Sequence, residues 1–189
     1  MGNRTIDPTD GPIQFPFNER KALAASTHLL ARAGGRMPYM RLVKLLYLAD
    51  RASFLEYGHP ITGDRYVAMK LGPVLSTVYD RIKEGEWGGL IRKVRYDVRL
   101  VGSEWIDPLS EAEIDILDDV SGFCEKLDHW KISNLTHELP EWKKAPNKIN
   151  GDISVESILK ALGKAEHDIA ATAEESREQA FFEEVFSDP

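Results

Sequence analysis

The sequence has 189 residues, of which 42% are hydrophobic and 29% charged, and its net charge is −7. This length predicts one compact domain with tails, and the negative charge argues against nonspecific nucleic-acid binding, which depends on neutralising phosphates. A single cysteine, Cys124, excludes an intrachain disulfide and a cysteine-based zinc site, and the absence of a long apolar run predicts no membrane span or signal peptide, so we expect a cytoplasmic protein.

The N-terminal part of the chain predicts an irregular arm followed by two helices. The arm covers residues 1–17 and is rich in proline and glycine. Asn18 is a typical N-cap, and the helix that it begins is expected to end at the Gly34-Gly35 pair. A second helix is predicted from about residue 38 to 57. Because it carries apolar residues on both sides, we expect it to be central, with other elements packed around it.

Turn and strand signals follow the second helix. Residues 65–70 predict a short extended segment, and the Gly72-Pro73 pair predicts a new helix with proline in its first turn. Apolar and polar residues then alternate between residues 90 and 101. This alternation predicts a half-buried strand or hairpin.

The C-terminal half is predicted to be mainly helical. Ser110 begins a capping-box sequence, Ser133 is expected to cap a short helix that ends before Pro140, and Ser154 is expected to cap another. The fold class is therefore mostly α, of the α+β type, with one compact helical domain around the helix at about 38–57 and a small β-hairpin or sheet. We place this domain at residues 18–163 and an acidic, helix-prone C-terminal extension at residues 164–189.

The sequence contains none of the common catalytic or phosphate-binding motifs. There is no phosphate-binding loop, nucleophile elbow or zinc-protease motif, and the five histidines are scattered. We therefore predict no catalytic residues, no cofactor and no metal. An alternative is a metal site assembled from Asp50, His137 and a third ligand. Cys124 lies on an apolar helical stripe and is expected to be a core residue.

Three blocks of the sequence together resemble the Panacea domain, the family of SocA-like antitoxins that also includes phage-associated proteins. They are Lys-Leu-Leu-Tyr-Leu-Ala-Asp-Arg at 44–51, Gly-His-Pro-Ile-Thr-Gly-Asp-Arg-Tyr-Val-Ala-Met-Lys-Leu-Gly-Pro-Val at 58–74, and Leu-Thr-His-Glu at 135–138. The resemblance extends from about residue 20 to 162. It implies a non-enzymatic antitoxin of a toxin–antitoxin system, which neutralises a cognate toxin encoded nearby by direct protein–protein interaction.

Two other functions remain open beside this one. The chain could be a proteolytic adaptor that delivers the toxin to a protease, which would then be a second partner. It could also be a small enzyme that uses His137 and Asp50. Many family members carry an additional DNA-binding or zinc module, but this chain lacks a Cys-x-x-Cys motif, so no nucleic-acid partner is expected.

Four polar residues of the family blocks lie within apolar patterns. They are Tyr47, Asp50, Thr136 and His137. A buried carboxylate is destabilising by several kcal/mol unless it is paired or hydrogen-bonded, so Asp50 needs a partner. We predict that the four side chains meet in one structural network, in which Asp50 accepts a hydrogen bond from Thr136, His137 or the segment 64–66.

Toxin contact is expected from residues outside this network. Residues 1–100 carry a net charge of +6 and residues 101–189 a net charge of −13, an asymmetry that suits docking against a charged protein. We predict that the acidic half covers a cationic surface of the toxin. The candidate toxin-binding residues are Asp64, Arg65, Tyr66, Lys70, Trp142, Phe181, Phe182 and Phe186.

Overall fold

The computed structural model describes residues 11–147 and 149–186 of the chain. Its helices are α1 (Glu19–Arg32), α2 (Tyr39–Tyr57), α3 (Ser76–Lys83), α4 (Glu111–Phe123), α5 (His129–His137), α6 (Pro140–Lys144), α7 (Val155–Ala161) and α8 (Glu166–Phe186). Its strands are β1 (Arg36–Pro38), β2 (Tyr66–Met69), β3 (Gly72–Leu75), β4 (Glu86–Trp87), β5 (Ile91–Val94), β6 (Asp97–Leu100) and β7 (Gly151–Ile153). The mostly helical α+β class predicted from the sequence is confirmed.

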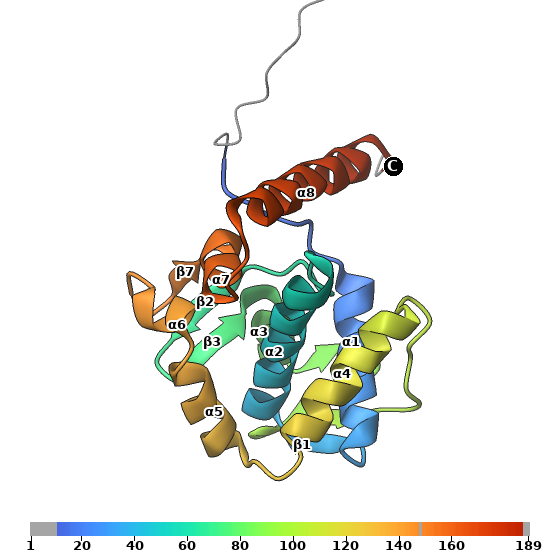
Figure 1. The fold of residues 1–189 in the computed structure, drawn as a ribbon. Coiled ribbons are helices and arrows are strands. Elements are labelled where there is room, and N and C mark those ends of the chain that lie inside the picture. The colour runs from blue at the N-terminus through green and yellow to red at the C-terminus, as the bar shows by residue number, and fades with distance from the viewer. Residues whose placement is uncertain (1–10, 148, 187–189) are drawn as a thin grey trace, which may run out of the picture.

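Helix α2 lies at the centre of the molecule, as the sequence predicted. It contacts α1, α4 and α5 as well as β3, and Figure 1 shows these elements arranged around it. The face that carries Leu42, Leu46 and Phe54 is fully buried. The helix ends at Gly58, which has the left-handed backbone conformation (φ 82°) that glycine adopts without strain.

Two small antiparallel sheets flank this helical core. The first has the strand order β1-β6-β5-β4, and the second has the order β3-β2-β7. The predicted hairpin between residues 90 and 101 is confirmed as β5 and β6, which are joined by the two-residue turn Arg95-Tyr96. The backbone N–H of Tyr39 donates to the carbonyl oxygen of Tyr96 (2.9 Å), so this turn is fixed against the start of α2.

The helix starts predicted from capping residues are largely confirmed. The side chain of Asn18 accepts a hydrogen bond from the backbone N–H of Lys21 at the start of α1. Ser110 and Glu113 form a complete capping box at the start of α4, and Ser154 caps α7. These positions were predictable because capping is a local interaction between residues three apart in the chain.

The helix predicted to begin at Gly72-Pro73 is wrong. These residues begin β3, which pairs with β2 in a two-residue hairpin, and α3 starts only at Ser76. Pro73 has no N–H to donate, which is tolerated because β3 is an edge strand paired with β2 alone. The left-handed conformation of Gly72 (φ 100°) suits the end of the hairpin turn and not the start of a helix.

The predicted cap at Ser133 is also wrong. Helix α5 begins earlier, at His129, and the side chain of Asp128 caps it. Ser133 lies inside this helix, is buried, and donates its hydroxyl to the carbonyl oxygen of Leu71 (2.7 Å). It therefore connects α5 to the turn between β2 and β3.

The C-terminal extension forms helix α8, which lies across one end of the molecule (Figure 1). Its first half is anchored by buried Ile169 and by Thr172, whose hydroxyl donates to the carbonyl oxygen of Gly58 (3.1 Å). The arm residues 11–17 have no regular secondary structure, although Phe15 is buried. Residues 1–10 of the predicted arm lie outside the described residues. Within the described part of the chain, every helix is too short or too polar to cross a membrane.

Candidate interaction site

Asp50 is the centre of a buried hydrogen-bonded cluster beneath the segment 61–66. Its side chain is fully buried in the middle of α2. One carboxylate oxygen accepts the backbone N–H groups of Ile61 (2.9 Å) and Thr62 (3.0 Å). The other oxygen accepts the hydroxyls of Thr62 and Tyr66, the latter at 2.9 Å. Asp50 therefore joins the centre of α2 to the chain between α2 and β2.

Burial and hydrogen bonding act on Asp50 in opposite directions. Burial raises the pKa of its carboxyl group to about 6, although the hydrogen bonds from Thr62, Tyr66 and Ile61 oppose this rise. The ionised form therefore depends on these donors, and removing any of them would leave a buried charge less compensated.

Thr136 and His137 do not join this cluster, so the single four-residue network predicted from the sequence is wrong. The predicted hydrogen bond from the segment 64–66 to Asp50 is confirmed, and its donor is Tyr66. The hydroxyl of Thr136 donates to the carbonyl oxygen of Ser133 (2.8 Å), and the ring of His137 stacks on Trp142 with 4.4 Å between ring centroids. Helix α5 places both residues against β3, next to its first residue, Gly72. A Cβ atom on Gly72 would lie 2.5 Å from the Thr136 hydroxyl oxygen, so only glycine fits there.

Lys44 forms a second buried polar contact of α2, close to Gly72. It is fully buried, and its ammonium group donates to the carbonyl oxygen of Pro73. Burial lowers the pKa of Lys44 to about 7. Burial also lowers the pKa of His137, and the nearby charge of Lys44 lowers it further.

Tyr47 lies between Lys44 and Asp50 on α2 and connects this helix to α6. Its ring packs edge-on against Tyr66, with 5.7 Å between centroids, and its hydroxyl donates to buried Glu141 (3.1 Å). The same carboxylate oxygen of Glu141 is 2.7 Å from the Nε atom of Arg51. The sequence prediction missed Lys44, Arg51 and Glu141. The spacing of Lys44, Tyr47 and Arg51 along one helix face was the signal that could have found the first two.

Asp64 has a structural role that the sequence prediction did not assign. Its carboxylate accepts the backbone N–H groups of Thr77 (3.0 Å) and Val78 (2.9 Å), which lie in the first turn of α3. A carboxylate in this place satisfies two unpaired donors and interacts favourably with the helix dipole. Asp64 and Tyr66 are both buried, and the hydroxyl of Tyr66 is engaged by Asp50, so they do not form the exposed toxin-binding surface that the sequence predicted.

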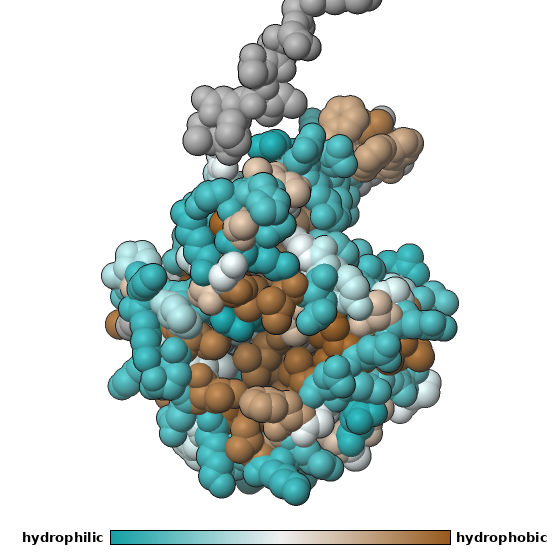
Figure 2. All heavy atoms as spheres, in the orientation of Figure 1, coloured by the Kyte–Doolittle hydropathy of each residue, from teal (hydrophilic) through white to brown (hydrophobic). Residues whose placement is uncertain are grey.

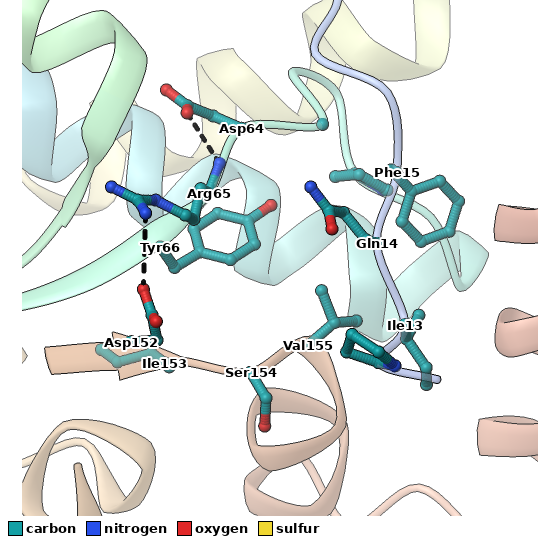
Figure 3. A pocket seen from close by; sticks show the side chains of 13 residues that line it. Ile13, Gln14, Phe15, Asp64, Arg65, Tyr66, Asp152, Ile153, Ser154 and Val155 are labelled. Carbon is teal, nitrogen blue, oxygen red and sulfur yellow. Dashed lines mark hydrogen bonds and ion pairs between the residues drawn. The ribbon is translucent and has the colours of Figure 1, made fainter. Parts of the chain in front are cut away.

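Arg65, Lys70 and Trp142 are the other candidates in this part of the fold. Arg65 and Lys70 are exposed, and Trp142 is half-buried, donating its indole N–H to the carbonyl oxygen of Met69 (3.1 Å). Figure 3 shows Arg65 directed towards Asp152, 3.9 Å away, at the side of a pocket of about 200 Å³. Phe15 and its neighbours in the arm cover the other side of this pocket.

The three phenylalanine candidates lie together on the outer end of α8. Phe181, Phe182 and Phe186 are 61%, 57% and 77% exposed, and the rings of Phe182 and Phe186 stack with centroids 6.0 Å apart. Figure 2 shows them as an apolar group at the end of the otherwise polar helix. We call residues 178–186 the aromatic end of α8.

A second exposed apolar area covers the outer side of α2. Leu48 and Ala52 are partly buried there, and Leu55, on the same helix face, is 45% exposed. Figure 2 shows a hollow lined with apolar residues over α2, bordered by α4, α5 and α7. We call it the α2 hollow. Contiguous apolar surface of this kind commonly marks a site of protein–protein interaction.

The groups considered for catalysis or metal binding are not assembled into a site. Asp50 and His137 contact different partners, as described above, so they do not form the pair that the enzyme alternative requires. Among the described residues, no group of three or more His, Cys, Asp or Glu side chains is placed to hold a metal ion. Cys124 is a buried free thiol whose pKa is raised by burial.

Comparison with known proteins identifies the central part of the chain. Residues 42–143, more than half of the sequence, match the family model described as antitoxin SocA-like, Panacea domain. Searches of curated proteins and of solved structures gave no match. The family match supports an antitoxin-type role.

Proposed function

We propose that this chain, which belongs to the SocA-like antitoxin family with a Panacea domain, neutralises a cognate toxin by direct binding and without catalysis. The family match over residues 42–143 is the observation that carries this proposal. Most of the polar residues in the family blocks hold the fold together, so the toxin must be bound by other surfaces. We expect the toxin to be a protein encoded beside this chain, in the cytoplasm.

The α2 hollow is the surface that best fits this role within the matched region. It is concave and apolar (Figure 2), and Leu55 is a large apolar side chain of α2 that remains exposed. Burying apolar surface is the main favourable contribution to protein association, at about 25 cal/mol per Å². A toxin that covers this hollow would bury α2, α4 and α5, which are all elements of the matched segment.

The aromatic end of α8 supplies a second contact of a different character. Glu178, Glu183 and Glu184 accompany its phenylalanines, so the segment combines apolar anchors with negative charge. This chemistry fits a toxin surface that is cationic and carries apolar pockets. Such a surface is what a toxin acting on nucleic acid would present, and its coverage would block the substrate.

Co-expression with the adjacent gene tests the proposal. The neighbouring protein is expected to arrest growth when expressed alone, and this chain is expected to relieve the arrest and to co-purify with it. The variants Leu55→Glu and Phe182→Ser/Phe186→Ser are each expected to weaken the complex by about tenfold or more, as measured by calorimetry.

Ile149→Ser is the matched control because Ile149 is also an exposed apolar residue but lies on neither surface. It is expected to leave the affinity unchanged. A harmless neighbour that does not co-purify would overturn the proposal. Relief of arrest only in a protease-competent host, with loss of the neighbouring protein, would replace direct neutralisation by proteolytic delivery.

A further inference from the structure

An apolar groove with aromatic walls lies at the end of the molecule opposite to α8. Its volume is about 510 Å³, and its lining comes from the starts of α2 and α5 and from the β2–β3 and β5–β6 turns. Tyr39, Tyr96 and Trp130 line it, and Trp130 is 59% exposed and Tyr96 80% exposed. We call it the aromatic groove. In Figure 1 the labels β1 and α5 mark its end of the molecule, whereas α8 lies at the other end.

The groove is fixed by the fold and does not depend on flexible side chains alone. The backbone N–H of Tyr39 donates to the carbonyl oxygen of Tyr96, which holds the β5–β6 turn against α2. Ser133 donates to the carbonyl oxygen of Leu71, which holds the β2–β3 turn against α5. Both turns are therefore held in place before any partner binds, which lowers the entropic cost of docking.

Three basic residues adjoin the residues that line the groove, and the lining itself contains one carboxylate, that of Asp97. Lys70 precedes Leu71 in one turn and Arg95 precedes Tyr96 in the other, and the ammonium group of Lys93 lies 5.5 Å from the centre of the Tyr39 ring. The nearby carboxylates are already engaged: Asp97 pairs with Arg36, and Asp128 caps α5. The groove therefore fits a segment that carries both aromatic side chains and negative charge.

The chain itself carries a segment of this chemistry, the aromatic end of α8. Its phenylalanines are largely exposed, and its glutamates give it a negative charge. This segment cannot reach the groove of its own molecule, because α8 is anchored at Ile169 and Thr172 at the opposite end.

We propose that the aromatic end of α8 of one copy docks into the aromatic groove of a second copy, so that the free protein self-associates head to tail. Phe182 or Phe186 would enter between Tyr96 and Trp130, while the glutamates face the basic rim. Because the tail and the groove are different surfaces, a head-to-tail dimer leaves one tail and one groove free. The association is therefore expected to continue with concentration unless rotation closes it into a ring.

Sedimentation velocity of the isolated full-length chain tests this directly. Wild type is expected to show a mass that rises with concentration and falls in about 0.5 M salt, since screening weakens the charged contacts. The groove variant Tyr96→Ser/Trp130→Ser and the tail variant Phe182→Ser/Phe186→Ser are each expected to remain monomeric. Ile149→Ser should associate like wild type.

Mixing the two variants gives the decisive result. The groove variant retains a tail and the tail variant retains a groove, so the mixture is expected to form a one-to-one dimer that cannot extend. A mixture that stays monomeric, a wild type that stays monomeric, or association that survives either double substitution would overturn the proposal. Capture of an acidic aromatic peptide by the groove without self-association would overturn the second copy as its occupant.

These results are independent of the proposed antitoxin function. The measurement uses the chain alone, and the groove variant alters no residue of the α2 hollow or of α8. Full neutralisation by a groove variant that no longer self-associates would separate the two properties. Failure of self-association would leave the antitoxin proposal untouched.

Discussion

The surroundings of Asp50 and the aromatic end of α8 differ in almost every physical respect. Asp50 is an ionisable side chain that is fully buried and accepts hydrogen bonds from Ile61, Thr62 and Tyr66. The phenylalanines at the end of α8 are apolar and mainly exposed, and they lie outside the segment that matches the family. Asp50 is a charged group removed from water, and the phenylalanines are apolar groups exposed to water. Both arrangements are unfavourable unless other contacts offset them.

The two regions differ in which contacts offset this cost, contacts within the fold or contacts with a partner. Asp50 is compensated within the fold, so its substitution should change stability. The aromatic end of α8 is compensated only when a partner covers it, so its substitution should change association and leave stability nearly unaltered. The polar residues of the family blocks thus mainly hold the fold, and we propose binding at the apolar α2 hollow and at the aromatic end of α8, of which only the latter lies outside the matched segment.

The largest effect is expected from Asp50→Ala. The substitution leaves the backbone donors of Ile61 and Thr62 and the hydroxyl of Tyr66 buried without an acceptor, which should lower the free energy of unfolding by about 3–5 kcal/mol. Urea denaturation measures this loss. Asp119→Ala, at an exposed carboxylate of α4, is the control and should change stability by less than about 0.5 kcal/mol. A loss for Asp50→Ala as small as that of the control would contradict the structural role.

The next largest effect is expected in the pH dependence of stability, when wild type is compared with the variant Asp50→Asn. The folded-state pKa of about 6 exceeds the ordinary value of 3.8, so the folded protein binds the proton more tightly than the unfolded chain. The contribution of Asp50 to stability is therefore complete below the unfolded pKa and declines as the pH rises through about 6. Relative to Asp50→Asn, wild type should lose about 2 kcal/mol between about pH 4.5 and pH 7, measured by denaturation at both values. A difference that stays constant with pH would disprove the raised pKa.

Asp64→Ala should have a smaller effect of the same kind. It removes the acceptor for the backbone N–H groups of Thr77 and Val78, and the first turn of α3 would lose its cap. We expect a loss of about 1–2 kcal/mol in the free energy of unfolding. Hydrogen exchange should show faster exchange at these two amides in particular. Uniform acceleration across the protein would indicate global destabilisation and no local capping role.

The smallest effect on stability is expected from Phe182→Ser/Phe186→Ser. Both side chains are more than half exposed, so the melting temperature should fall by no more than about 2 °C. The same variant should show the largest loss of association. A marked fall in melting temperature would mean that the aromatic end of α8 belongs to the core, and the contrast with Asp50 would disappear.

The success of sequence-based prediction follows the distance between interacting residues. The start of α4 was predictable because Ser110 and Glu113 lie three residues apart, and the central place of α2 followed from its two apolar sides. The partners of Asp50 were only partly predictable. The donors from Ile61 and Thr62 depend on how the chain returns after α2, which no local pattern records.

The errors have a common physical origin. Gly72 and Pro73 match the start of a helix locally, but the pairing of β2 with β3 overrides that preference. Asp64 is a residue type common in turns. It caps α3 through Thr77, which lies thirteen residues later in the chain, so a local pattern does not reveal this contact. The buried position of Glu141 beside Tyr47 and Arg51 likewise depends on residues about ninety positions apart.

The strand order β3-β2-β7 has a consequence for how the protein is made. Strands β2 and β3 are synthesised early, whereas β7 (Gly151–Ile153) follows about eighty residues later and pairs with the free edge of β2. Until those residues leave the ribosome, one edge of β2 keeps unpaired backbone groups that can pair with other chains. The matched segment ends at residue 143 and therefore does not include β7, the third strand of this sheet. A nascent or truncated chain that ends there would be prone to aggregation, and only the longer chain completes the fold.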